Sequence, residues 1–314
     1  MRPRGALVLG RVLSSIFWQH SDSITLQLGQ ITLMRTWNTV SIVGVGLIGG
    51  SIGLALRERR LAQRVVGIGR RAETLATALS VGAITESTTD LARGVAEAEL
   101  IVVATPVDRI AQHVREAAAA CPASALLTDA GSTKGTIVAE LTKTLPGTAR
   151  FVGSHPIAGG EKQGPGEARA DLFVGRLVVV TPTASTPRET LQPVEEFWQS
   201  LGAKVAQLSP DDHDRHLAAS SHVPHIVAAM LASAISADSL PFVGSGFRDT
   251  TRVAAGDPEL WTQILLANRA SILAALTPFE TAITALRGAL ERADAAALRQ
   301  TLTEAKSKRD AVGS

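Results

Sequence analysis

The stretch that decides the fold is Gly44-Val45-Gly46-Leu47-Ile48-Gly49, a glycine-rich sequence of the form GxGxxG. It follows an apolar run at residues 39–43 that is typical of a strand, and it opens a stretch with helical spacing to about residue 60. Between a strand and a helix, the first glycine permits a tight turn and the second lets the backbone approach a pyrophosphate. The third lets the helix pack closely on the strand. The pattern predicts a dinucleotide site at the helix N-terminus, with a ligand-free turn as the alternative.

Further strand signals follow this unit at regular intervals and are separated by helix-like stretches. They lie at residues 65–68, 100–104, 125–128, 150–153, 177–180 and 204–208. This alternation predicts an α/β fold with a Rossmann-like, doubly wound and mostly parallel sheet. Beyond it, Ala/Leu-rich segments with helical spacing occupy residues 213–237, 258–286 and 295–308. We therefore predict a dinucleotide-binding domain at residues 34–182 and an all-helical substrate and dimerisation domain at residues 183–314.

The first 33 residues carry Arg2, Arg4 and Arg11 around a short apolar stretch, which faintly resembles a targeting sequence. No convincing cleavage site of small residues follows. Because the first clear strand begins after Met34, we predict that residues 1–33 form a dispensable, disordered extension.

The composition points to a small-molecule partner. Among 314 residues the formal net charge is only +2, with Lys and Arg spread along the chain, so neither a nucleic acid nor an anionic membrane is an expected partner. No uninterrupted apolar run approaches the roughly 20 residues that span a bilayer. The single cysteine, Cys121, can form neither an internal disulfide nor a thiolate metal site. We therefore predict a cytoplasmic protein without a metal.

The end of the second strand bears on the choice of cofactor. A site that prefers NAD usually has an acidic residue there to bind the ribose 2′-hydroxyl, and this chain has Arg70 and Arg71 instead. Two guanidiniums suit a 2′-phosphate because arginine offers bidentate, permanently charged hydrogen bonding. The sequence favours NADP over NAD, and the alternative is that both arginines are solvated turn residues. We also assign Thr105 and Pro106, which follow the strand at 100–104, to the cofactor site.

Three other blocks carry residues suited to chemistry. They are Asp129-Ala130-Gly131-Ser132-Thr133-Lys134-Gly135, then Gly153-Ser154-His155-Pro156, and the segment at residues 244–252. The first two lie at carboxyl ends of predicted strands, the edge where open α/β sheets bind ligands. Ser132 and His155 should therefore point into the cofactor crevice. A lone histidine after a strand is more often structural than catalytic, so the combination of blocks carries the prediction.

The order of these blocks resembles the prephenate dehydrogenase family, which includes arogenate and cyclohexadienyl dehydrogenases. The resemblance runs from about Val40 to the C-terminal helices and rests on VGVGLIGGSIGLAL, VVATPV, DAGSTKG, GSHPIAGGEKQGP, SSHVPH and GSGFRDTTRVAAGDPELW. It implies transfer of hydride from ring carbon C4 to a nicotinamide, with loss of the ring carboxylate as CO2. By resemblance, His155 is the catalytic histidine, Ser132 orients the hydroxyl and the nicotinamide, and Arg252 grips a substrate carboxylate. A neutral imidazole in hydrogen-bond reach can take the hydroxyl proton.

The resemblance also implies substrate-side roles for further residues. His225 matches a family histidine on the substrate's side of the site. Trp261 resembles a residue that the family presents at the dimer interface, and we also assign Trp261 to the substrate site. Asp249 and Glu161 either pair as a gate across the cleft or are simply solvated. We interpret Arg248 as a surface ion-pair residue. The other histidines of the 213–225 stretch, His213, His216 and His222, are predicted to be surface or packing residues because Pro224 breaks the helical spacing that a metal site would need.

Several alternatives stay open at this point. A β-hydroxyacid dehydrogenase or imine reductase would share the architecture, although it does not explain His155 and Arg252 together. A non-catalytic NADP-sensing protein would share the cofactor site, although it does not explain His155 and Ser132. The sequence does not decide between prephenate and arogenate, because their discrimination depends on one or two polar contacts. The many apolar positions after His213 predict a homodimer built through the helical domain.

Overall fold

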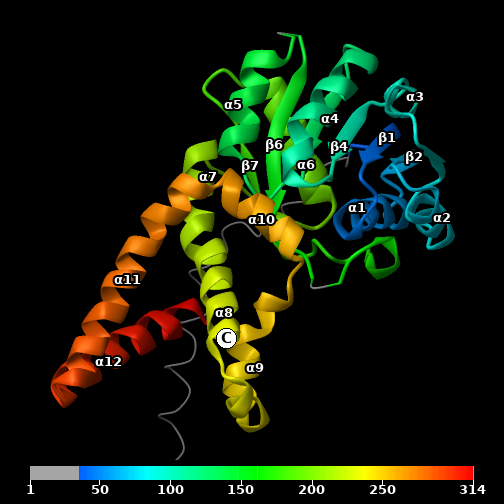
Figure 1. Ribbon diagram of the computed structural model, residues 1–314. Coiled ribbons are helices and arrows are strands. Elements are labelled where there is room, and N and C mark those ends of the chain that lie inside the picture. Colours follow the sequence, from blue (N-terminus) through cyan, green and yellow to red (C-terminus); the bar gives the residue numbers. More distant parts are fainter. Residues whose placement is uncertain (1–34, 147, 161, 314) are drawn as a thin grey trace, which may run out of the picture. The chain divides into compact units, whose positions relative to one another are not determined.

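The computed structural model describes residues 35–146, 148–160 and 162–313, so the predicted extension at residues 1–33 lies outside the described residues. Eight strands form one sheet in the order β3-β2-β1-β4-β5-β6-β7-β8 (Figure 1). Their bounds are β1 Trp37–Val43, β2 Ala62–Ile68, β3 Glu86–Thr88, β4 Leu100–Val103, β5 Leu126–Asp129, β6 Arg150–Pro156, β7 Leu177–Thr181 and β8 Lys204–Gln207.

The sheet is mostly parallel, which confirms the predicted Rossmann-like class. Strands β1 to β6 pair in parallel, whereas β7 pairs antiparallel with β6 and β8 follows β7 in parallel. The carboxyl ends of β1, β4, β5 and β6 therefore meet at one edge of the sheet. The short edge strand β3 was missing from the sequence prediction.

The strands bury side chains on both faces of the sheet. Along β4, Leu100 and Val102 belong to one core cluster, and Ile101 and Val103 belong to the other. Because successive residues of a strand point to opposite faces, a continuous apolar run indicates a sheet that is covered on both sides. The first cluster is covered by α1 (Leu47–Glu58), α2 (Ala72–Ser80) and α6 (Arg188–Ser200), and the second by α3 (Leu91–Val95), α4 (Val107–Ala120) and α5 (Gly135–Thr144).

Helices make up most of the described chain after β8. They are α7 (Pro210–Leu217), a π-helical turn (Ala218–His222), α8 (Val223–Ala234), α9 (Ser245–Thr251), α10 (Pro258–Ala267), α11 (Arg269–Glu291) and α12 (Ala295–Val312). Pro224 does not break the helix, contrary to our expectation. It occupies the first turn of α8, where its missing N–H is tolerated, and the π-helical turn just before it carries the helix onward from α7.

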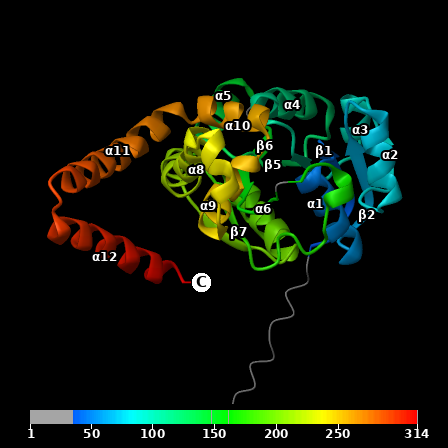
Figure 2. The same ribbon diagram turned by 60° about the horizontal axis from the view of Figure 1, so that its bottom comes forward.

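The sheet continues beyond residue 182, where we divided the chain. Helix α6 packs on the sheet and β8 ends it at Gln207. The division into two domains stays a prediction, and the end of the sheet favours a boundary near residue 208. Figure 2 shows α11 extending away from the sheet and α12 running back from its outer end.

Part of the helical region also has the length of a membrane span. Among the described residues, one helical stretch, Pro210–Ala234, could cross a membrane by length and composition alone, and 33% of its most apolar window is buried. This stretch contains buried His213 and Asp214, which contact residues of the sheet region. The stretch therefore packs on the sheet region through polar contacts, and the absence of a membrane contact stays a prediction.

Candidate active site

The glycine-rich turn between β1 and α1 has the geometry that a dinucleotide needs. Gly44 has a φ of 94°, and a Cβ atom there would lie 2.6 Å from the carbonyl oxygen of Ala104. A Cβ on Gly49 would lie 2.1 Å from the Gly44 carbonyl oxygen, so this glycine lets α1 pack against the turn. A Cβ on Gly46 would meet none of the described atoms within 4 Å. Two positions are thus tightly packed, and the one between them is open to a ligand.

The other residues predicted for the cofactor surround this turn. Leu47 and Ile48 begin α1, so their backbone N–H groups lie in its first turn, where an anion is favoured. Thr105 lies two residues after the end of β4, and its Oγ1 hydrogen-bonds with His113 Nδ1 at 3.0 Å. Pro106 is the N-cap of α4. These residues lie at the ends of β1 and β4, which are neighbours in the sheet.

Arg70 and Arg71 lie after β2, the strand next to β1, at the same carboxyl edge of the sheet. Both side chains are exposed, and Arg71 is the N-cap of α2. Since β2 pairs in parallel with β1, both arginines lie near the carboxyl edge that carries the glycine-rich turn. Their guanidiniums are accessible from solvent at the position where the ribose of a dinucleotide is expected.

Ser132 lies just after β5, and His155 lies near the end of the neighbouring strand β6. Ser132 is partly buried in the loop between β5 and α5, and His155 is the penultimate residue of β6. Two hydrogen bonds of the Asp129 carboxylate tie these segments together, because it accepts from the N–H groups of Gly131 at 2.8 Å and Ser154 at 3.1 Å. Lys134 forms a completely buried ion pair with the same carboxylate. Asp129 therefore fixes the loop of Ser132 against the strand of His155.

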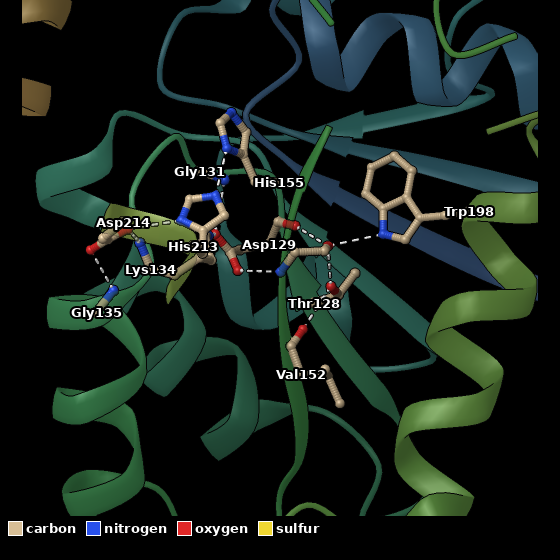
Figure 3. A network of polar contacts seen from close by, with 11 residues as sticks. Thr128, Asp129, Gly131, Lys134, Gly135, Val152, His155, Trp198, His213 and Asp214 are labelled. Carbon is tan, nitrogen blue, oxygen red and sulfur yellow. Dashed lines mark hydrogen bonds and ion pairs between the residues drawn. The ribbon is translucent and has the colours of Figure 1, made fainter. Parts of the chain in front are cut away.

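The polar contacts of His155 extend into the helical region (Figure 3). His155 Nδ1 lies 2.8 Å from His213 Nε2, and His213 Nδ1 lies 2.8 Å from Asp214 Oδ1. The Asp214 carboxylate also accepts from the backbone N–H groups of Lys134 and Gly135, each at 2.8 Å. In Figure 3 the second ring nitrogen of His155, Nε2, points away from His213. The structure thus leaves that nitrogen to face a ligand.

The surroundings keep these histidines neutral. Burial lowers the pKa of His155 well below its usual value, and the neighbouring His213, Lys134 and His222 lower it further. Burial also lowers the pKa of His213, although its hydrogen bond to Asp214 acts in the opposite direction. The pKa of His222 falls to about 4, mainly because of burial. A neutral imidazole at position 155 can accept a proton near neutral pH.

His225 and Trp261 form a second group. The two rings are stacked with centroids 3.4 Å apart and planes 8° from parallel. His225 is buried, and its Nδ1 atom has no hydrogen-bond partner among the described residues. A buried polar atom of this kind is costly unless a ligand or water satisfies it. This observation fits a polar group of a substrate.

The remaining predicted substrate residues lie on α9 and just after it. Asp249 is exposed in the last turns of α9, and Arg252 is exposed at the start of the following 3-10 helix, Arg252–Ala255. Glu161 lies outside the described residues, so the predicted pairing of Asp249 with Glu161 stays a prediction. Arg248, which we interpreted as a surface residue, is exposed.

Two histidines of the 213–225 stretch have polar contacts that the sequence did not predict. His213 and His222, which we expected to be surface or packing residues, are buried. His213 bonds His155, and His222 Nδ1 lies 3.1 Å from the side-chain nitrogen of Asn268, which also donates to the Asp214 carbonyl oxygen at 2.8 Å. The sequence signal was present in the spacing of the histidines on one helix, but their partners lie on other elements. His216 is exposed, as expected.

Comparison with known proteins agrees with this arrangement. Residues 52–207 match the family described as prephenate dehydrogenase, nucleotide-binding domain, and residues 209–304 match prephenate dehydrogenase, dimerization domain. The chain belongs to the prephenate dehydrogenase family. It is therefore an oxidoreductase, which confirms the resemblance drawn from the motif order.

Individual members of the prephenate dehydrogenase family are similar over most of this chain. A prephenate dehydrogenase of Bacillus subtilis is 34% identical over 88% of this chain and 76% of its own length. A cyclohexadienyl dehydrogenase of Zymomonas mobilis is 31% identical over 89% and 97%. The solved prephenate dehydrogenase of A. aeolicus, in complex with hydroxyphenyl propionate and NAD+, has a TM-score of 0.81 and 32% identity over 88% of this chain and 98% of that one.

Proposed function

We propose that this enzyme oxidises and decarboxylates prephenate, arogenate or both to 4-hydroxyphenylpyruvate or tyrosine, with hydride transfer to NAD(P)+, in tyrosine biosynthesis. The observation that carries the proposal is the hydrogen bond of His155 with His213 at the sheet edge that also carries the glycine-rich turn. The A. aeolicus relative supports it, because that enzyme was solved with NAD+ and a molecule that has the hydroxyphenyl ring of the proposed product.

The proposed reaction needs few groups from the protein. The bound nicotinamide supplies the hydride acceptor, and aromatisation of the ring drives the loss of CO2. His155 Nε2 accepts the proton of the C4 hydroxyl as the hydride leaves C4. Ser132 holds that hydroxyl in register with the cofactor, since a short side chain suits close packing between the two. Burial of His155 supports its role, because it keeps the imidazole unprotonated at neutral pH.

Recognition of the substrate is assigned to residues of the helical region. Prephenate and arogenate each carry two carboxylates, so we propose that Arg252 binds one of them with bidentate geometry. His225, stacked on Trp261, offers the buried Nδ1 to the side chain that differs between prephenate and arogenate. Asp249 and Glu161 would control access to the cleft.

We propose NADP as the preferred cofactor. The support is the pair of exposed guanidiniums, Arg70 and Arg71, at the expected position of the ribose. Binding of NADP+ and NAD+ to the parent and to the Arg70→Ala/Arg71→Ala variant would test this by titration calorimetry. We expect the variant to weaken NADP+ selectively, while the exposed Arg188→Ala control keeps the parent ratio. Tighter binding of NAD+ by the parent, with an unaltered ratio in the double variant, would reject NADP.

We also propose a homodimer formed through the helices. An apolar stripe with spacings of 3, 4, 3 and 4 residues runs along α11, and we call it the α11 stripe: Leu276, Phe279, Ile283, Leu286 and Leu290. Phe279 is 37% exposed, Ile283 50% and Leu290 61%. Such spacing is typical of helices that pack against another helix, and exposed apolar surface of this extent favours a partner. The match to a dimerization domain supports a second copy of the chain as that partner.

One assay tests the proposed activity against its alternatives. The protein is mixed with prephenate, arogenate or a simple 3-hydroxyacid, each with NADP+ or NAD+, and absorbance of the reduced nicotinamide is followed. Turnover of a cyclohexadienyl acid is expected. Turnover of the 3-hydroxyacid alone would favour a hydroxyacid dehydrogenase, and cofactor binding without any turnover would favour an NADP-sensing protein.

A further inference from the structure

The tautomer of His155 decides whether this histidine can act as a base. A neutral imidazole carries hydrogen on one nitrogen only, and the nitrogen without hydrogen accepts protons. His155 Nδ1 is occupied by its contact with His213 Nε2 at 2.8 Å, and the two rings meet edge to face with centroids 5.0 Å apart. The direction of this hydrogen bond therefore determines the state of His155 Nε2, which points away from His213 in Figure 3.

Asp214, which bonds the other side of His213, sets the direction of the hydrogen bond between His155 and His213. Burial alone would raise the pKa of Asp214, but hydrogen bonds from His213 and from the backbone of Lys134 and Gly135 together lower it. An ionised carboxylate can only accept hydrogen bonds. His213 Nδ1, which lies 2.8 Å from Asp214 Oδ1, must therefore be the donor.

The same reasoning passes through His213 to His155. His213 is completely buried and neutral, so with hydrogen on Nδ1 its Nε2 carries a lone pair. That lone pair accepts the hydrogen of His155 Nδ1. We propose that Asp214 and His213 are positioning residues that hold His155 in the tautomer with a bare Nε2, ready to take the substrate proton. This inference rests on the proposed function only for the identity of that proton.

The hydrogen bonds from His155 through His213 to Asp214 can also carry the positive charge that proton transfer creates. When His155 Nε2 accepts the hydroxyl proton, the O–H bond breaks, its electrons stay on oxygen and an N–H bond forms. The hydrogen on His155 Nδ1 can then pass to His213 Nε2, which moves the positive charge next to Asp214. Lys134 opposes a charge on either histidine, but only on His213 do carboxylates, those of Asp214 and Asp129, favour the charge. The second position is thus the better one for the charge.

The arrangement connects the two regions of the chain. His155 and the backbone donors Lys134 and Gly135 lie on β6 and at the start of α5, whereas His213 and Asp214 lie on α7. The side chain of Asn268, between α10 and α11, donates to the Asp214 carbonyl oxygen at 2.8 Å and holds α7 in place. A helix of the C-terminal region therefore prepares a residue of the sheet for catalysis.

The first test is independent of any substrate. Histidine labelled with 15N in the full-length protein reports which ring nitrogen lacks hydrogen, and the His155→Asn variant identifies the signals of His155. We expect the bare nitrogen of His155 to be Nε2 in the parent. In Asp214→Asn we expect a second form with bare Nδ1, because the amide no longer enforces donation by His213. A hydrogen on Nε2 of His155 in the parent would overturn the proposal, whether or not the proposed substrates are turned over.

The second test measures turnover against pH. We expect Asp214→Asn and His213→Asn each to lower kcat roughly 10²-fold. Asp214→Asn should also move the acidic limb to lower pH, because this substitution removes the counter-charge for the imidazolium. KM and the dissociation constant of the cofactor should change less than about twofold. His216→Asn, on the exposed side of the same helix, is the matched control and should behave as the parent. Parent kcat and an unmoved limb in Asp214→Asn would contradict the positioning role.

Discussion

The sheet region and the C-terminal helices bury their apolar side chains to very different extents. In the sheet, residues of β1, β4 and β5 fill two core clusters within one chain. None of the described residues of α12 is buried, and on α11 only Ile272 and Ala289 are. Figure 2 shows these two helices away from the sheet. The difference indicates that the sheet completes its core alone, whereas the helices are suited to complete theirs against a second copy.

The largest effect is expected from placing charges on the α11 stripe. Ile283→Glu with Leu290→Glu would bury four carboxylates in a symmetric dimer, and each unpaired buried charge costs several kcal/mol. We expect light scattering to report a monomer at micromolar concentration. The matched control is Thr277→Glu with Thr284→Glu, which places the same charges at exposed positions on the other face of α11 and should stay dimeric. A parent that is itself monomeric would refute the proposed dimer.

A smaller effect is expected on the free energy of unfolding, which should respond differently to a shortened side chain in the sheet and in the C-terminal helices. Leu100→Ala removes a completely buried side chain of β4, so we expect the free energy of unfolding to fall by about 2–5 kcal/mol. Leu302→Ala removes a side chain of α12 that is 65% exposed, and we expect a change within about 0.5 kcal/mol at fixed oligomeric state. Urea titrations at one protein concentration measure both. Equal losses would show that α12 is as well packed as the sheet.

The smallest effect concerns pH and the buried histidines where the two regions meet. The pKa of His222 is about 4 in the folded protein and near 6.5 in an unfolded chain, so the unfolded state binds more protons between these values. Stability should therefore fall as pH is lowered from 6.5 towards 4, and thermal melts would record a declining Tm. His222→Asn should reduce this dependence, to which buried His213 also contributes, while His216→Asn should keep it in full. A Tm that is constant across this window would contradict the buried, neutral state of His222.

The sequence predicted local features better than contacts between distant segments. The turn from Gly44 to Gly49 was predictable because its glycine pattern is short and stands between a recognisable strand and helix, although the atoms packed against Gly44 belong to Ala104 and Thr105. Strand β3, with three residues, is too short to give a period, and the π-helical turn before Pro224 has no simple sequence signature. The bond between His155 and His213 joins residues 58 positions apart and depends on how α7 packs on α5. That packing cannot be derived from the periodicity of either segment.

We propose that His155 is the general base of a prephenate or arogenate dehydrogenase, and the pH dependence of kcat in His155→Asn tests this role most directly. Because burial lowers the pKa of His155, the acidic limb of the parent should lie below pH 6.5. We expect the variant to lose that limb and to lower kcat by roughly 10² to 10⁴, with cofactor affinity retained. Turnover at the parent rate, or an unchanged acidic limb in the variant, would contradict the account.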